Sequence, residues 1–192
     1  MLDETWRDES ERLWRSFVLL RETVEDTNTS DRLEAVDPLR QFCRHAFELR
    51  DWLQAAPDID QSAKTAIGQL FGTPSNNPAR RVPATSVALA ACADIANASK
   101  HFALDRASFS EGGHAKVTHE SMSSLSDLPE SLRGLIDGGI PRFGDHQWDW
   151  RITINGVEKD ALMLAEDAMN DWTACLEGVG LVKAHPNGWD FL

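Results

Sequence analysis

Hydrophobic positions in the N-terminal part of the chain recur with the period of a helix. Over residues 4–26 the apolar side chains fall on one face and most other positions are charged, which predicts an amphipathic helix. A second helix is expected to have Asp37 as its N-cap and Pro38 at its first position, and to run to about Ala56.

Three more helices are expected farther along the chain. Asp60 and Gly72 have the residue types of an N-cap and a helix stop, so they bound a short helix over residues 60–71. The segment GTPSNNPARRVP that follows is rich in turn formers and predicts a loop. An alanine-rich helix is expected at about residues 84–108, where small side chains let neighbouring helices approach closely. The last helix is expected at about residues 159–177.

After Gly112–Gly113 the apolar positions no longer recur with the period of a helix but at every second residue, as in a strand. This change predicts two antiparallel strands, at about residues 114–120 and 148–154, with Asn155–Gly156 as a tight turn after the second. The expected fold is therefore mainly α (α+β): a four-to-five-helix bundle with a small antiparallel β-hairpin before the C-terminal helix. We expect one domain over residues 1–192, with the β insertion at about 113–156.

The net charge of −12 is unevenly distributed over the 192 residues. Residues 1–60 and 121–192 each carry −7, whereas residues 61–120 carry +2. Because attraction to phosphate dominates nucleic-acid binding, this balance argues against a protein that coats DNA or RNA. Only the middle segment would tolerate a polyanion, and we expect Arg80, Arg81 and Arg106 to be its binding residues.

Cysteine content and hydropathy bear on the cellular compartment. The three cysteines are far apart, odd in number and surrounded by apolar residues, which indicates reduced core thiols. No apolar run is long enough for a transmembrane helix. The N-terminal segment MLDETWRDESERLW carries charges of both signs and does not resemble a signal peptide. We expect a cytoplasmic protein with no membrane partner.

Several motifs for cofactors and metals are absent from the sequence. It contains no phosphate-binding loop, no GxGxxG, no HExxH, no GxSxG and no CxxC. A group at His114, His119, Asp145 and His146 has ligand-type side chains, but scattered surface histidines are the commoner explanation. We expect neither a metal nor a cofactor.

The most distinctive polar segment is Asp94-Ile95-Ala96-Asn97-Ala98-Ser99-Lys100-His101. At 100° per residue, Asp94, Asn97 and His101 lie on one strip beside the apolar face of the helix. In a catalytic role, His101 acts as acid or base, Asn97 orients a phosphate or water and Lys100 offsets the phosphate charge. Asp94 is a further candidate catalytic residue of this strip. In a structural role, the strip is a buried polar ladder that bonds to a neighbouring segment. His45 lies at a similar core boundary on the second helix and is a further candidate binding residue.

This segment resembles the hallmark of the HEPN superfamily, an Arg and a polar residue followed four to six positions later by a His. Asn97 and His101 match that pattern, whereas Ala96 stands in place of the Arg; Arg40 and His45 have an Arg-x4-His spacing on an earlier helix. The chain also resembles a group of uncharacterised bacterial helical proteins with an Arg-Asp-Trp helix and an Asp-x-Ala-Asn-x-x-Lys-His helix. HEPN domains are helical bundles, and many are metal-independent ribonucleases of toxin–antitoxin and other defence systems, often with sites across a dimer interface.

Three functional hypotheses follow. The first is a non-catalytic interaction or oligomerisation protein of a bacterial defence or toxin–antitoxin type system, a homodimer that docks a protein partner. The second is a metal-independent ribonuclease that cleaves RNA with His101. The third is an acidic mimic of nucleic acid. The first is favoured because Ala96 replaces the Arg that the ribonuclease motif requires.

Overall fold

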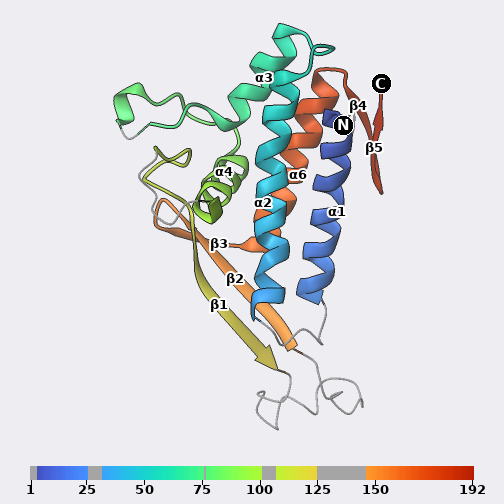
Figure 1. Cartoon of the computed structure of the whole chain (residues 1–192). Helices are drawn as coiled ribbons and strands as arrows, with labels where there is room; N and C mark the ends of the chain where they lie inside the picture. Colours follow the sequence, from blue (N-terminus) through green and yellow to red (C-terminus); the bar gives the residue numbers. More distant parts are fainter. Residues whose placement is uncertain (1–3, 26–31, 76, 101–106, 125–145) are drawn as a thin grey trace.

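The computed structural model describes residues 4–25, 32–75, 77–100, 107–124 and 146–192 (Figure 1). The fold is mainly helical, with a small antiparallel sheet before the C-terminal helix. α2 lies alongside α1 and α6, and α4 crosses it steeply, seen almost end-on in Figure 1. The α-helices of the described ranges are α1 (Trp6–Glu25), α2 (Arg32–Ala55), α3 (Gln61–Phe71), α4 (Val87–Lys100) and α6 (Ala161–Gly178).

The expected strands are present and somewhat longer than predicted. β1 (Lys116–Ser124) pairs antiparallel with β2 (His146–Ile154), and β2 pairs antiparallel with β3 (Val157–Asp160). On β2, the alternate residues Trp150 and Ile152 are buried against the helices. The alternation that predicted a strand is thus the alternation between core and outer face.

Two strand segments escaped the sequence prediction. β3 lies where the last helix was expected to begin; that helix starts after Asp160, whose side chain accepts a hydrogen bond from the Met163 N–H. A second hairpin follows α6, with β4 (Val182–His185) paired to β5 (Gly188–Phe191). Figure 1 places this C-terminal hairpin beside α1.

The predicted start of the second helix was wrong. α2 begins at Arg32, so Asp37 is not its N-cap and Pro38 lies inside the helix. Proline lacks the N–H that would bond one turn back, which costs a hydrogen bond. Val36, in the additional turn, is buried, and burial of its apolar side chain acts against that loss.

The alanine-rich helix is central, as predicted, but shorter than expected. α4 begins after Ser86, whose Oγ accepts a hydrogen bond from the Leu89 N–H. Its alanine-rich stripe is buried inside the protomer, with Ala91, Ala93 and Ala96 fully inaccessible. Residues 101–106 lie outside the described residues, and the chain is no longer helical at residues 107–108.

Tryptophans and two capped ends fix the helices relative to one another. Trp6, Trp150 and Trp172 are among the largest fully buried side chains. Trp172 of α6 donates a hydrogen bond from Nε1 to the Ala46 carbonyl of α2 (3.1 Å). α3 has the two ends predicted for it, at the N-cap Asp60 and at Gly72. The core thus forms around α2, α4 and α6.

Candidate functional site

Asp94, the first residue of the predicted polar strip, is completely buried. Its Oδ1 accepts a hydrogen bond from the Phe109 N–H (2.8 Å), and its Oδ2 accepts from Ser110 (3.0 Å) and Ala115 (3.2 Å). Nδ1 of His114 lies 3.5 Å from Oδ1. These donors compensate for the loss of water around a buried carboxylate. Asp94 therefore fixes the course of the chain after α4.

The rest of the strip is described only in part. Asn97 is half-buried, and Ala96 is fully buried, so an Arg at that position would have to enter the core. Lys100 is the last residue of α4, but its side chain is outside the described set. His101 and Arg106 lie outside the described residues altogether. The catalytic hypothesis for His101 therefore stays a prediction.

The two arginines of the predicted anion site have different environments. Arg80 ends a short 3₁₀ turn (Pro78–Arg80) and is exposed. Arg81 donates from Nη2 to the Ser75 carbonyl (2.8 Å) and to the Ser108 hydroxyl (2.9 Å). Arg81 thereby ties its loop to the segment after α4. These contacts indicate a structural role for Arg81 and leave Arg80 as the exposed cation of this pair.

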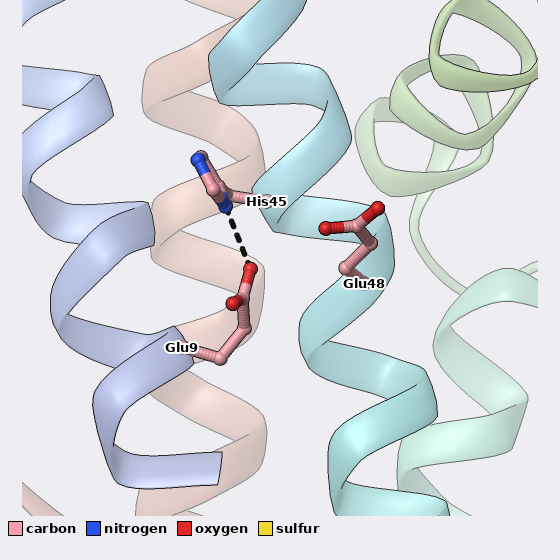
Figure 2. A group of neighbouring side chains, drawn as sticks. All are labelled: Glu9, His45 and Glu48. Atoms are coloured by element: carbon pink, nitrogen blue, oxygen red, sulfur yellow. Dashed lines mark hydrogen bonds and ion pairs between the residues drawn. The ribbon is translucent and has the colours of Figure 1, made fainter. Parts of the chain in front are cut away.

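The remaining predicted binding residue, His45, faces α1 instead of this loop. Figure 2 shows it beside Glu9, with Nδ1 2.7 Å from Oε1. Glu9 is only 2% exposed, and its Oε2 also accepts a hydrogen bond from Arg12 (3.2 Å). The structure therefore does not bring His45 together with Arg80 and Arg81. Its contact with Glu9 joins α1 to α2.

Glu48 completes a group that by residue type could hold a metal ion. One ligand atom from each of Glu9, His45 and Glu48 lies within 4.8 Å of the others (Figure 2). However, Glu9 is paired with Arg12, and Oε1 of Glu48 accepts a hydrogen bond from Nε of Arg44 (2.9 Å). Because guanidinium groups already neutralise both carboxylates, we interpret this group as a contact between helices. Of the other predicted metal group, only the side chain of His114 is described, beside Asp94.

A hollow of about 400 Å³ lies where α1, α6 and the C-terminal hairpin meet, and we call it the aromatic pocket. Its aromatic side chains are Trp14 and Phe17 from α1 and Trp189 from β5. The Trp14 ring is inclined by 58° to Phe17 and by 63° to Trp189, with centroids 6.1 and 6.2 Å apart. The three rings therefore form a corner instead of a parallel stack.

Hydrogen bonds hold the hairpin side of the aromatic pocket in place. Trp189 donates from Nε1 to Oγ1 of Thr173 on α6 (3.0 Å), and the Asn187 N–H donates to Nδ1 of His185 (3.1 Å). Gly188 has a φ of 148°, which L side chains rarely adopt, and lies against the His185 and Trp14 rings. The pocket is thus positioned by the turn as well as by the strands.

The polar lining of the aromatic pocket is acidic. Glu166 and Asn170 lie on the same face of α6 as Thr173, and neither has a hydrogen-bond or ion-pair partner among the described residues. Neither Lys nor Arg is among the described lining residues; His185 is the lining residue that can become cationic. The carboxylate of Glu166 is exposed. This arrangement suits a cationic group.

Sequence reasoning missed the aromatic pocket. The signal was present in HPNGWDF, where an Asn-Gly pair separates two short apolar segments, a typical hairpin pattern. Trp14 and Glu166 were not recognised because they come from helices far apart in the sequence. Only the packed fold brings them to one place.

Two further findings bear on function. None of the helices in the described ranges combines the length and apolar character that a membrane span requires. Comparisons of the chain with protein-family models, curated proteins and solved structures gave no match.

Proposed function

We propose that this protein is a non-catalytic interaction module that binds a basic segment of a partner protein beside the aromatic pocket. The single observation that carries the proposal is α6, which has four acidic residues and no Lys or Arg and places at the pocket a carboxylate, Glu166, that has no partner among the described residues. The resemblance to HEPN proteins suggests a bacterial defence or toxin–antitoxin type system as its setting.

The acidic residues of α6 have distinct roles. Asp171 accepts a hydrogen bond from Ser86, and Asp167 lies 3.7 Å from Nζ of Lys159. Glu177 accepts a hydrogen bond from the Ala184 N–H of the hairpin (2.8 Å). Glu166 lacks such a contact among the described residues. Within the described part of the chain, the negative charge of α6 that has no partner is thus at the pocket, where a Lys or Arg of a partner protein can neutralise it.

The buried state of α4 also supports a binding role away from this helix. Asp94 is committed to backbone donors, so it is not available as a general base at a surface site. Ala91, Ala93 and Ala96 of α4 are buried within the protomer, which argues against these small residues as the seam of a homodimer. A homodimer stays a prediction, and it would need another surface.

The test is the affinity for a fluorescent hexalysine peptide, measured by anisotropy at several salt concentrations. Glu166→Lys should weaken binding at least about tenfold, because it reverses the charge at the pocket. Glu22→Lys makes the same charge change on an exposed residue of α1 that does not line the pocket, and should weaken binding about twofold at most. Equal losses in the two variants would contradict a specific site and would favour the acidic mimic.

The ribonuclease alternative is tested separately with single-stranded RNA in the presence of EDTA. We expect no cleavage by the purified protein. Cleavage that disappears in His101→Ala at an unchanged melting temperature would overturn the non-catalytic proposal. Acid–base residues contribute roughly 10²–10⁴-fold to rate, so such a loss would be readily measured.

A further inference from the structure

We infer that the aromatic pocket binds a trimethylammonium group, either of a free cation or of a trimethylated lysine in a partner. This inference deepens the proposed function, because it specifies the cation that the acidic face receives. It rests on the pocket's acceptors, two of which are already bonded, on its aromatic corner and on the Glu166 carboxylate, which has no partner among the described residues.

Two acceptors of the pocket are already used by the hydrogen bonds that build it. Oγ1 of Thr173 already accepts the Trp189 N–H, and Nδ1 of His185 already accepts the Asn187 N–H. Among the described residues, Glu166 and Asn170 are the lining side chains whose acceptors make no hydrogen bond. A lysine ammonium carries three N–H donors and a guanidinium five, so either must use these acceptors or keep water molecules bound. A trimethylammonium group has no N–H donors.

The aromatic corner supplies the attraction that replaces hydrogen bonds. Aromatic faces attract a cation within about 6 Å of the ring centroid, and quaternary ammonium ligands use this contact most fully. Trp14 adjoins both Phe17 and Trp189 at inclined angles, so a rounded cation in the corner can approach more than one ring. The volume of about 400 Å³ is within the usual range for small-molecule sites.

Two arginines near the pocket, Arg21 and Arg15, have other contacts among the described residues. The guanidinium of Arg21 lies 6.0 Å from the Phe17 ring, at the limit of a cation–π contact, and Arg21 does not line the pocket. Arg15 belongs to an adjoining hollow and is paired with Glu11 (2.7 Å). The negative charge of Glu166 therefore remains for a ligand.

The first experiment compares choline with its uncharged carbon analogue, 3,3-dimethylbutan-1-ol, by isothermal titration calorimetry. We expect choline to bind at least about tenfold more tightly, since the two differ chiefly in charge and cation–π contacts contribute on this scale. Equal affinities, or the absence of saturable choline binding, would overturn the inference.

Variants locate the binding. Trp14→Leu should lower choline affinity about tenfold, whereas Trp14→Phe, which keeps an aromatic face, should lower it about threefold at most. Glu166→Gln should also weaken choline binding, and the matched Glu22→Gln should not. A choline affinity unchanged in both Trp14→Leu and Glu166→Gln would place the cation elsewhere and contradict the assignment.

A peptide arm separates the two sources of the group and the two proposals. A trimethyllysine peptide that binds more tightly than both its unmodified form and choline would identify a partner side chain as the source, whereas preference for choline would identify a free cation. Hexalysine binding without choline or trimethyllysine binding would overturn the inference and leave the proposed function intact. Choline binding without hexalysine binding would overturn the proposed function and leave the inference about the trimethylammonium group intact.

Discussion

Asp94 and the aromatic pocket both place polar groups beside apolar side chains, but they satisfy those groups differently. The Asp94 carboxylate is completely buried and accepts three backbone N–H donors. The Glu166 carboxylate is exposed and has no partner among the described residues. A polar group that is saturated inside the chain stabilises the fold, whereas one left unsaturated beside rings can bind something else.

The largest expected effect is the loss of Asp94. Asp94→Ala leaves three buried N–H groups without an acceptor, and we expect the free energy of unfolding to fall by about 3–5 kcal/mol. Asp94→Asn keeps one acceptor oxygen and should lose less. Urea denaturation measures both. As a control, Asp51→Ala, at a side chain that is 60% exposed, should change stability by about 0.5 kcal/mol or less. Near-normal stability of Asp94→Ala would contradict the view that the saturated Asp94 carboxylate stabilises the fold.

A smaller effect is expected at Glu9, which is buried but bonded to side chains instead of backbone. Glu9→Gln should lower the free energy of unfolding by about 1–3 kcal/mol through its weaker hydrogen bond to His45. The loss should be smaller than for Asp94→Ala because a freed His45, which is 21% exposed, can turn toward water. Thermal and urea unfolding of both variants in the same buffer test this order.

A third prediction concerns the hydrogen bond from Trp189 to Thr173, which holds one ring of the aromatic pocket in place. Removing the acceptor of the Trp189 N–H by Thr173→Val should cost about 1 kcal/mol of stability and weaken choline binding about threefold, because the ring is held less firmly. Thr65→Val, at an exposed threonine of α3 that bonds only within its own helix, is the matched control and should leave choline affinity unchanged. A Thr173→Val protein with full choline affinity would show that this hydrogen bond does not position the pocket.

The smallest expected effect is a difference in reactivity between two cysteines, one near Asp94 and one near Thr173 at the aromatic pocket. Cys92 lies on α4 near Asp94 and is fully buried; its hydrogen bond with Cys43, together with burial, raises the pKa of its thiol well above the usual value. Cys175 lies on α6 near Thr173 and is half-buried, and burial raises the pKa of its thiol. A thiol reagent at pH 8 should therefore label Cys175 slowly and Cys92 not at all.

The pH dependence of this labelling has a definite sign. A raised pKa means that the thiolate forms only at higher pH, so labelling of Cys175 should accelerate as the pH rises beyond the ordinary thiol range. Cys175→Ser should abolish labelling of the native protein. Rapid reaction of Cys92 would mean that the region around Asp94 opens readily, contrary to the saturated structure described above.

The elements that depend on local residue patterns could be predicted from the sequence. Asp60 and Gly72 mark the two ends of α3, and alternation along β2 reflects burial of every second side chain. The small side chains of α4 correctly predicted its central position among the helices. The start of α2 could not be predicted in this way, because the helix begins at Arg32, earlier than the local rule for Pro38 indicates, and Val36 in the additional turn is buried.

The sequence by itself determined the helical class, the position of the β insertion and the acidic balance, because each depends on residue type and short-range periodicity. Only the tertiary structure decided what the polar residues do. The donors to Asp94 come from residues 109–115, well beyond the end of α4. The aromatic pocket joins Trp14 to Glu166 and Trp189 across most of the chain. Hydrogen-bond saturation and aromatic corners are properties of contacts between distant segments, and no local pattern encodes them.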